Sequence, residues 1–306
     1  MSNAPKSSLP KLIVAAVVAE SINASPKTVY KMAKSGRCRP QHRILMGPVS
    51  VVPHFNFNLI AFEITTLTSL IMLLRNPHDK RAGKLLVVSV VTFFSLILVH
   101  VVLEALCKLI AMRYDQYALC FGRSFGFPAF YIGRMFETHW WFHCISAWVY
   151  DASPASFLVL TMYYCLTQPL DKAGRFVRTV GISLLICPLL YLLVPVSGPA
   201  YVFGSFPYHA PLLATPHVIQ VSAQELAPPN GVPSMHMVVA LLVLYFARYW
   251  KIGLVLGLLF VAFTASATLG LGEHYLIDLI AAVPYAALMI CLCGNKEPNA
   301  SCSLQA

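Results

Sequence analysis

Repeated apolar runs of membrane-spanning length are the feature that most constrains the fold of this chain. A hydrocarbon core of about 30 Å is crossed by about 20 apolar residues in a helix. Because 58% of the residues are hydrophobic and only 11% are charged, a soluble surface of ordinary polarity is excluded. The sequence therefore predicts an all-α, polytopic membrane helix bundle. Its predicted spans are 56–74, 85–112, 153–170, 178–197, 236–249, 252–271 and 275–293.

The run 126–150 is long enough to span but carries several ionisable side chains, namely Arg134, Glu137, His139 and His143. Two interpretations are open: a span inside the bundle, or a segment lying at the membrane interface.

Basic residues predict the orientation. Eight Lys and Arg residues precede residue 44, against one acid, Glu20, and the turns at 171–178 and 247–251 are basic too. Under the positive-inside rule these segments face the cytoplasm, which places 198–235 and 272–274 outside. The basic loop 75–84 would lie outside after a single span, so either 126–150 does not span or this loop breaks the rule.

Four regions follow: a basic cytoplasmic segment (1–54), N-terminal transmembrane or interfacial helices (55–150), a catalytic membrane core (151–295) and a short tail (296–306). Within the first region, 21–40 resembles part of a helix-turn-helix DNA-binding module. An amphipathic helix on anionic lipid explains it better, because it is too short to bury a core. We therefore expect membrane lipids, and no nucleic acid, as its partners.

The stretch "PSMH" (233–236) places Pro233, Ser234 and His236 at the start of an apolar helix. The free N–H groups of a helix N-terminus bind anions readily. Pro233 fixes the backbone there, Ser234 caps the helix or binds an anion, and His236 follows on the first turn. The alternative is a capped helix with an interfacial histidine.

A second group, in "EHYLID" (273–278), places His274 and Asp278 four residues apart, on one face of a helix. Asp278 is then able to accept the ring N–H of His274 and fix its tautomer. The alternative is a hydrogen-bonded pair that pins helices together. Glu273 fits a charge favourable to the helix dipole.

The two groups reach the same membrane face because one hairpin of two apolar helices separates them. Two histidines, a carboxylate and an anion-binding helix end suit nucleophilic displacement at phosphorus: one histidine attacks and the other protonates the leaving oxygen. No cofactor is needed. A metal site is conceivable, but the ligand spacing matches no standard pattern.

These motifs resemble the second and third motifs of the type-2 phosphatidic acid phosphatase superfamily, and "HYLID" is most similar to its inositol phosphorylceramide synthase-like branch. "LVPVSGPAYVFGSF" (193–206), which contains Gly198, is similar to a preceding segment of that branch. The resemblance covers about 153–293. It implies a six-helix phosphatase or phosphotransferase core with extra N-terminal helices.

The resemblance also implies residue roles: His274 as the site of a phosphohistidine, Asp278 as its orienting carboxylate and His236 as the leaving-group acid. Ser234 holds the phosphoryl oxygens, with Pro233, Gly198 and Thr268 at the substrate.

Two departures separate this chain from the phosphatases. Thr268 stands where they have an arginine. Their basic first motif is imitated only by "KMAKSGRCRP" (31–40), at the wrong spacing. Without those cations the two negative charges of a phosphomonoester are poorly neutralised. A phosphodiester carries a single negative charge and needs less neutralisation.

The sequence thus favours a multi-pass enzyme, in the inner membrane if bacterial, that transfers lipid phosphodiester groups on the periplasmic or lumenal side. The alternative is hydrolysis of a lipid phosphate or polyprenyl diphosphate by the same residues. A lipid transporter is less favoured, because inverted repeats and broken helices are not evident.

Other polar residues have secondary interpretations. Arg123 and Arg134 fit interfacial snorkelling better than a supply of missing charge. His139 and His143 accompany Trp140 and Trp141 in "ETHWWFHC", which is typical of an interfacial aromatic belt rather than of a metal or headgroup site. Glu63 and Glu104 fall inside apolar runs and are predicted to be internal hydrogen-bond partners or substrate-channel residues.

Overall fold

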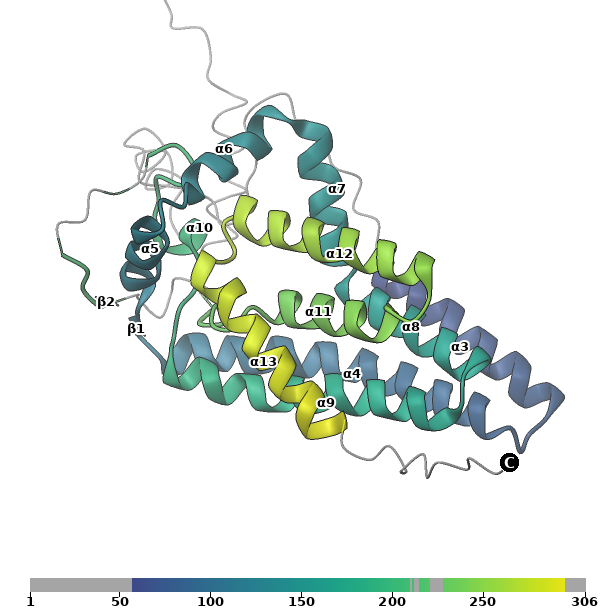
Figure 1. Cartoon of the computed structure of the whole chain (residues 1–306). Helices are drawn as coiled ribbons and strands as arrows, with labels where there is room; N and C mark the ends of the chain where they lie inside the picture. Colours follow the sequence, from purple (N-terminus) through teal and green to yellow (C-terminus); the bar gives the residue numbers. More distant parts are fainter. Residues whose placement is uncertain (1–56, 210, 212–214, 221–227, 295–306) are drawn as a thin grey trace, which may run out of the picture. The chain divides into compact units, whose positions relative to one another are not determined.

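The computed structural model describes residues 57–209, 211, 215–220 and 228–294, and this part of the chain is almost entirely helical (Figure 1). The predicted all-α class is confirmed. The helices are α3 (Phe57–Arg75), α4 (Lys80–Leu109), α5 (Asp115–Ser124), α6 (Ala129–Thr138), α7 (Trp140–Asp151), α8 (Ser153–Thr167), α9 (Leu170–Leu193), α10 (Pro199–Val202), α11 (Met235–Ala247), α12 (Lys251–Gly270) and α13 (Leu276–Gly294). Two short antiparallel strands, β1 (Met112–Arg113) and β2 (Ile219–Gln220), pair Met112 with Gln220.

Five of the described helices, α3, α4, α9, α12 and α13, are long and apolar enough to cross a membrane, as expected of an integral membrane protein. The runs predicted at 153–170 and 236–249 form shorter helices, α8 with 15 residues and α11 with 13. The regions 1–54 and 296–306, including 21–40 and 31–40, lie outside the described residues.

The basic segment 171–178, predicted to be a turn, is instead the start of α9, and that prediction was wrong. Only Gln168 and Pro169 separate α9 from α8. The segment is amphipathic: Ala173 and Phe176 are fully buried while Lys172 is exposed. Burial of one apolar face stabilises the helix despite its charges.

The run 126–150 does not form one span. His139 has non-helical backbone angles and separates α6 from α7, and both helices pack against α12. Trp140 and Trp141 are more than half exposed, which fits the predicted interfacial belt.

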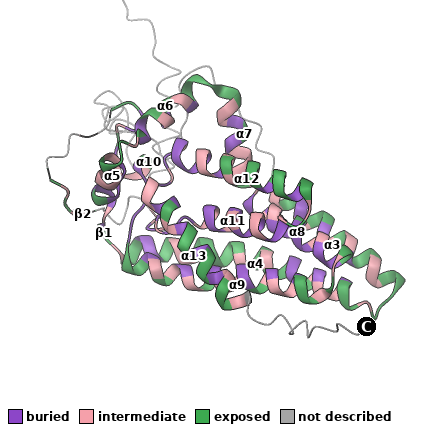
Figure 2. Ribbon diagram, viewed as in Figure 1, coloured by how far each residue is buried: buried purple, intermediate pink, exposed green. Residues whose placement is uncertain are grey.

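Helix α11 lies at the centre of the bundle and contacts α8, α9, α12 and α13. Buried residues gather along it, whereas the outer faces of α3 and α4 expose many apolar side chains (Figure 2). Glu63 and Glu104 lie on these outer helices, where both are exposed, and Glu104 pairs with Lys108 at 2.8 Å. The prediction that these acids are internal was therefore wrong.

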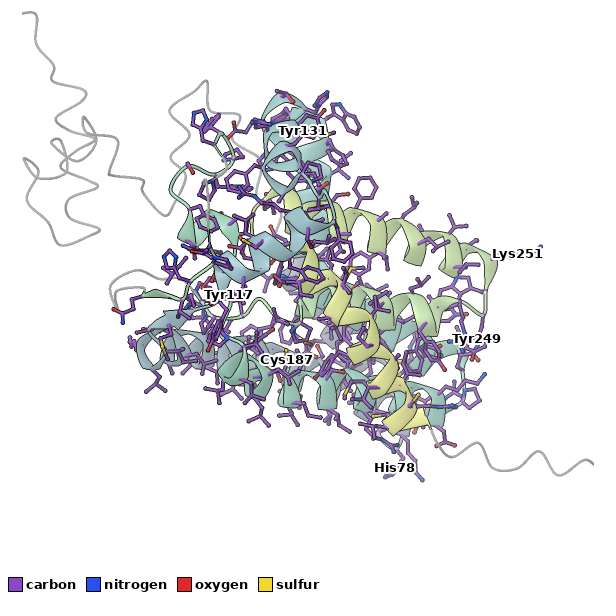
Figure 3. The ribbon with its side chains drawn as sticks, turned by 60° about the vertical axis from the view of Figure 1, so that its left-hand side comes forward. His78, Tyr117, Tyr131, Cys187, Tyr249 and Lys251 are labelled. Atoms are coloured by element: carbon purple, nitrogen blue, oxygen red, sulfur yellow. The ribbon has the colours of Figure 1, made fainter. Side chains whose placement is uncertain are left out.

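Three basic segments meet at one end of the bundle: 75–84 around the α3–α4 turn, the start of α9, and the α11–α12 turn. Arg81 and Lys84, at the start of α4, donate to the carbonyls of Leu166 and Leu170 beside the α8–α9 turn. Trp250, in the α11–α12 turn, packs its ring 4.4 Å from that of Tyr163 in α8. Figure 3 shows His78, Tyr249 and Lys251 of these segments far from Tyr117 and Tyr131. The loop 75–84 therefore lies with the other basic segments.

Candidate active site

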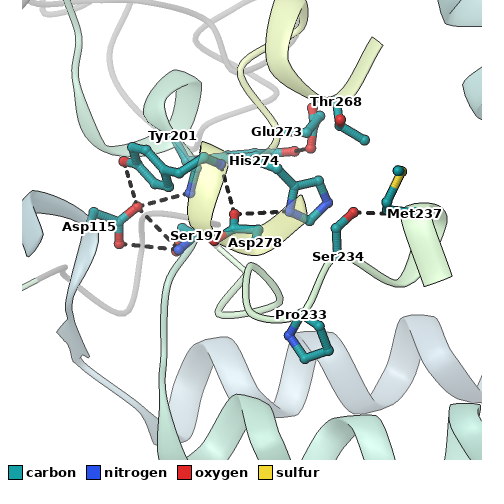
Figure 4. A network of polar contacts seen from close by, with 12 residues as sticks. Asp115, Ser197, Tyr201, Pro233, Ser234, Met237, Thr268, Glu273, His274 and Asp278 are labelled. Atoms are coloured by element: carbon teal, nitrogen blue, oxygen red, sulfur yellow. Dashed lines mark hydrogen bonds and ion pairs between the residues drawn. The ribbon is translucent and has the colours of Figure 1, made fainter. Parts of the chain in front are cut away.

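The His274–Asp278 pair forms at the opposite end, where α12 passes into α13 (Figure 4). The ring Nδ1 of His274 lies 3.2 Å from Oδ2 of Asp278, and both side chains are almost completely buried. A carboxylate only accepts hydrogen bonds, so Nδ1 carries the proton and Nε2 presents its lone pair. The same Oδ2 accepts the backbone N–H of Tyr275 at 2.8 Å.

The pair is not carried by one regular helix, as the spacing suggested, because α13 begins only at Leu276. His274 lies in the preceding turn, where its backbone N–H donates to Thr268 at 3.1 Å. That turn depends on Gly272, whose φ is +76°, a left-handed conformation that favours glycine.

Gly198 brings a separate loop against this turn. A side chain at this position would collide with the carbonyl of Glu273, and φ is +152°. The next residues continue the contact, since Ala200 N–H donates to Gly272 at 3.0 Å. Close backbone approach is therefore what requires glycine at residue 198.

Ser234 links the second motif to the third. Its side chain caps α11 by accepting Met237 N–H at 3.5 Å, and its own N–H donates to the Asp278 carbonyl at 3.2 Å. Pro233 is buried, and its carbonyl accepts the Tyr191 hydroxyl at 3.4 Å. The two motifs are thus joined through the backbone.

His236 faces His274 across the site. The ring centroids are 6.5 Å apart. An attacking atom lies about 3–3.5 Å from its target, and an acid hydrogen-bonds the leaving oxygen at about 3 Å. The gap between the rings therefore suits a phosphoryl group placed between a nucleophile and an acid.

Tyr150 of α7 stacks on His236, with ring centroids 3.8 Å apart and an interplanar angle of 23°. Burial, together with the nearby Glu273, raises the pKa of the Tyr150 phenol well above its usual value. It therefore stays neutral beside the histidine. No motif in the sequence indicated this contact.

Thr268 and Glu273 have local partners. The Thr268 hydroxyl donates to the Ala265 carbonyl of its own helix at 2.9 Å, and its side chain is buried. Glu273 accepts the hydroxyl of Tyr201 at 2.7 Å. Glu273 lies three residues before the start of α13, and its contribution to the helix dipole stays a prediction.

Arg123 and Arg134 donate to carbonyls of the loop between α10 and β2. Arg123 reaches Pro211 at 2.7 Å, and Arg134 reaches Tyr208 at 3.0 Å. Both guanidinium groups thus hold the loop in place.

His139 and His143 have neighbours of their own. His139 contacts the Thr138 hydroxyl at 2.9 Å, and His143 stacks on Phe136. Within the described residues, no three His, Cys, Asp or Glu side chains are grouped to hold a metal ion.

A set of residues that sequence reasoning missed lies behind the site. Asp115 accepts the N–H groups of Ser197 and Gly198, and the hydroxyl of Tyr275. Burial raises the pKa of the Asp115 carboxyl to about 6, although these hydrogen bonds oppose the shift. Residues this distant in sequence share no local pattern, so only the fold brings them together.

A family model described as the PAP2 superfamily matches residues 119–292, more than half of the chain. The chain belongs to the PAP2 superfamily. Its members are phosphatases or phosphotransferases of lipid phosphates, which supports an enzyme of this type. The match includes His236, His274 and Asp278 but begins after Asp115. No curated protein and no solved structure gives a significant match.

Proposed function

We propose that this PAP2 superfamily protein transfers the phosphoryl headgroup of a lipid phosphodiester to an alcohol, through an intermediate on His274. The observation that carries the proposal is the buried Nδ1–carboxylate contact of 3.2 Å, with the ring of His236 6.5 Å away. In the first step Nε2 of His274 bonds to phosphorus. The bond from phosphorus to the lipid oxygen breaks, and His236, which takes up a proton when the anionic phosphate binds beside it, gives that proton to the leaving oxygen.

In the second step the acceptor alcohol attacks phosphorus and the N–P bond breaks. The alcohol proton returns to His236, which restores the starting state. Asp278 opposes the positive charge that forms on the His274 ring in between. The phosphoryl group lies between Ser234, Pro233 and Gly198. Thr268 supports the turn behind it.

A phosphodiester is preferred over a phosphomonoester because of where the cations lie. Thr268 is uncharged where the phosphatases have an arginine. Arg123 and Arg134 each donate a hydrogen bond to a loop carbonyl rather than to the phosphate site. A dianionic monoester would face two carboxylates, Asp278 and Glu273, with less compensation. The similarity of "HYLID" to the inositol phosphorylceramide synthase-like branch supports the same choice.

The position of the basic turns supports an extracytoplasmic site. The turns after α3, α8 and α11 gather at the end of the bundle that is opposite His274. Because basic turns stay in the cytoplasm, the site opens to the periplasm or a lumen.

The test uses purified protein in lipid nanodiscs with a panel of fluorescent-acyl donors: phosphatidic acid and phosphatidyl-choline, -ethanolamine, -glycerol and -inositol. Each donor is supplied with and without ceramide or unlabelled diacylglycerol as the acceptor alcohol. Transfer gives fluorescent diacylglycerol together with a new headgroup-bearing lipid, and only when the acceptor is present. Release without an acceptor means hydrolysis. Full activity of His274→Ala would show the mechanism to be wrong.

A further inference from the structure

Asp115, at the start of α5, joins two separate parts of the site. Its side chain is fully buried. It accepts the backbone N–H of Ser197 at 3.1 Å and of Gly198 at 2.9 Å. Through Oδ1 it also accepts the hydroxyl of Tyr275 at 2.9 Å. One carboxylate therefore connects the 197–198 loop with the turn that carries His274.

The connection continues to the reacting pair through Tyr275. The Tyr275 side chain is held by Asp115, while its backbone N–H donates to Oδ2 of Asp278 at 2.8 Å. This is the oxygen that lies 3.2 Å from Nδ1 of His274. Displacement of the Tyr275 backbone would therefore move the oxygen that orients the ring.

Neighbours of Asp115 also hold the 197–198 loop. Arg113, which is only 1% exposed, donates through Nε to the hydroxyl of Ser197 at 2.9 Å. Tyr114 N–H donates to the Pro195 carbonyl at 2.9 Å. The segment 113–115 thus fixes the loop that presses Gly198 against the third-motif turn.

Packing alone does not explain a buried carboxylate at residue 115. A buried carboxylate loses its hydration, and apolar side chains of similar volume often stabilise an interior at least as well. Three hydrogen bonds to two different loops make Asp115 a geometric constraint rather than a space filler.

We propose that Asp115 is a positioning residue for the reaction, acting through Tyr275 on the Asp278–His274 pair. This inference rests on the proposed function. Segment 113–115 precedes the part of the chain that matches the superfamily model, so the match by itself assigns Asp115 no role. A displacement of about 1 Å at a reacting group lowers turnover by as much as about 100-fold.

The test compares Tyr275→Phe and Asp115→Asn with a matched control, Tyr285→Phe. Tyr285 lies further along α13, is 8% exposed, and donates its hydroxyl to the Ser183 carbonyl at 2.7 Å. Each phenylalanine variant loses one buried phenol hydrogen bond. In the nanodisc assay, Tyr275→Phe and Asp115→Asn are expected to lower kcat about 10- to 100-fold and to change KM less than threefold. Tyr285→Phe is expected to keep kcat within about threefold.

A second readout does not depend on activity. In protein with ¹⁵N-labelled histidine, the ring resonances of His274 are assigned by their loss in His274→Ala. Tyr275→Phe and Asp115→Asn should shift them, and Tyr285→Phe should not. The double variant should lose little more than the larger single loss, because both changes act through one connection.

The possible results separate the two proposals. If Tyr275→Phe matches Tyr285→Phe in kcat and in the His274 resonances, the positioning role is overturned. If the wild type transfers and hydrolyses none of the donors, the proposed function fails, and the resonances alone decide the positioning role. If Asp115→Asn does not fold, Tyr275→Phe alone decides it.

Discussion

Replacing Asp278 by asparagine separates the charge of this side chain from its hydrogen bonds. Oδ2 of Asp278 accepts two hydrogen bonds, from Tyr275 N–H at 2.8 Å and from His274 Nδ1 at 3.2 Å. Because the backbone N–H requires an acceptor, the amide oxygen should take the place of Oδ2. The His274 tautomer is then kept, and mainly the negative charge is lost.

The expected loss follows from that distance. Two unit charges 3.2 Å apart interact by about 5 kcal/mol at an effective dielectric constant of about 20. The charge of the phosphorylated ring is spread over the ring, which roughly halves this value. At about 1.36 kcal/mol per tenfold, Asp278→Asn should lower kcat by about 100- to 5,000-fold. Asp278→Ala should lose more, because it also leaves the Tyr275 N–H without a partner.

The assay is turnover in nanodiscs, together with thermal unfolding of the same samples. Asparagine removes a buried charge, so the unfolding midpoint should stay constant or rise while kcat falls. A loss below about tenfold would refute the electrostatic role of Asp278. A loss equal to that of Asp278→Ala would show that the tautomer was not preserved.

Three further predictions use other contacts. Gly198→Ala should destabilise the protein by about 1–3 kcal/mol through collision and backbone strain. The control Gly181→Ala, at an α9 position with open space around it, should stabilise the protein by about 0.5–1 kcal/mol. Unfolding midpoints measure both changes, and equal shifts would contradict the close backbone approach at Gly198. Tyr150→Phe should keep activity within about threefold because stacking remains. Tyr150→Ala should lose about 2- to 10-fold, since aromatic pairs contribute about 0.5–1.5 kcal/mol. A large loss in Tyr150→Phe would instead assign a role to the hydroxyl. The pKa of Asp115 rises from 3.8 to about 6 in the folded state, so its stabilising contribution is complete below pH 3.8 and is lost as pH rises through 6. Over this window the free energy of unfolding of the wild type should fall by about 3 kcal/mol relative to Asp115→Asn. A relative increase in the free energy of unfolding would reverse the sign of the shift.

The sequence predicted the parts of the fold that depend on local hydrophobicity. Apolar runs located the membrane helices, because the length and polarity of a run decide whether it crosses a bilayer. The start of α9 was missed because a charged segment can still form a helix when Ala173 and Phe176 bury its other face. The break at His139 lacked a glycine or proline to mark it.

In the candidate site, too, features that are local in the sequence were predicted and long-range contacts were not. The sequence indicated His236, His274 and Asp278 as candidates because their spacing and helix-end positions are local features. Asp115 and Tyr150 were not indicated, because an aspartate after a span or a tyrosine in an aromatic segment has many ordinary explanations. Their roles depend on contacts over long sequence distances, such as the 160 positions between Asp115 and Tyr275.

The charge distribution explains why the substrate preference should differ from that of the superfamily phosphatases. A phosphoryl group beside His274 would lie roughly 6 Å from the Asp278 carboxylate, where each unit of negative charge costs about 3 kcal/mol at an effective dielectric constant of about 20. A dianionic monoester therefore binds about 100-fold more weakly than a monoanionic diester of the same shape, unless a cation compensates. At residue 268 this chain has a threonine whose hydroxyl is bonded to Ala265. In the proposed mechanism, the carboxylate that orients His274 would thus also favour the substrate with the lower charge.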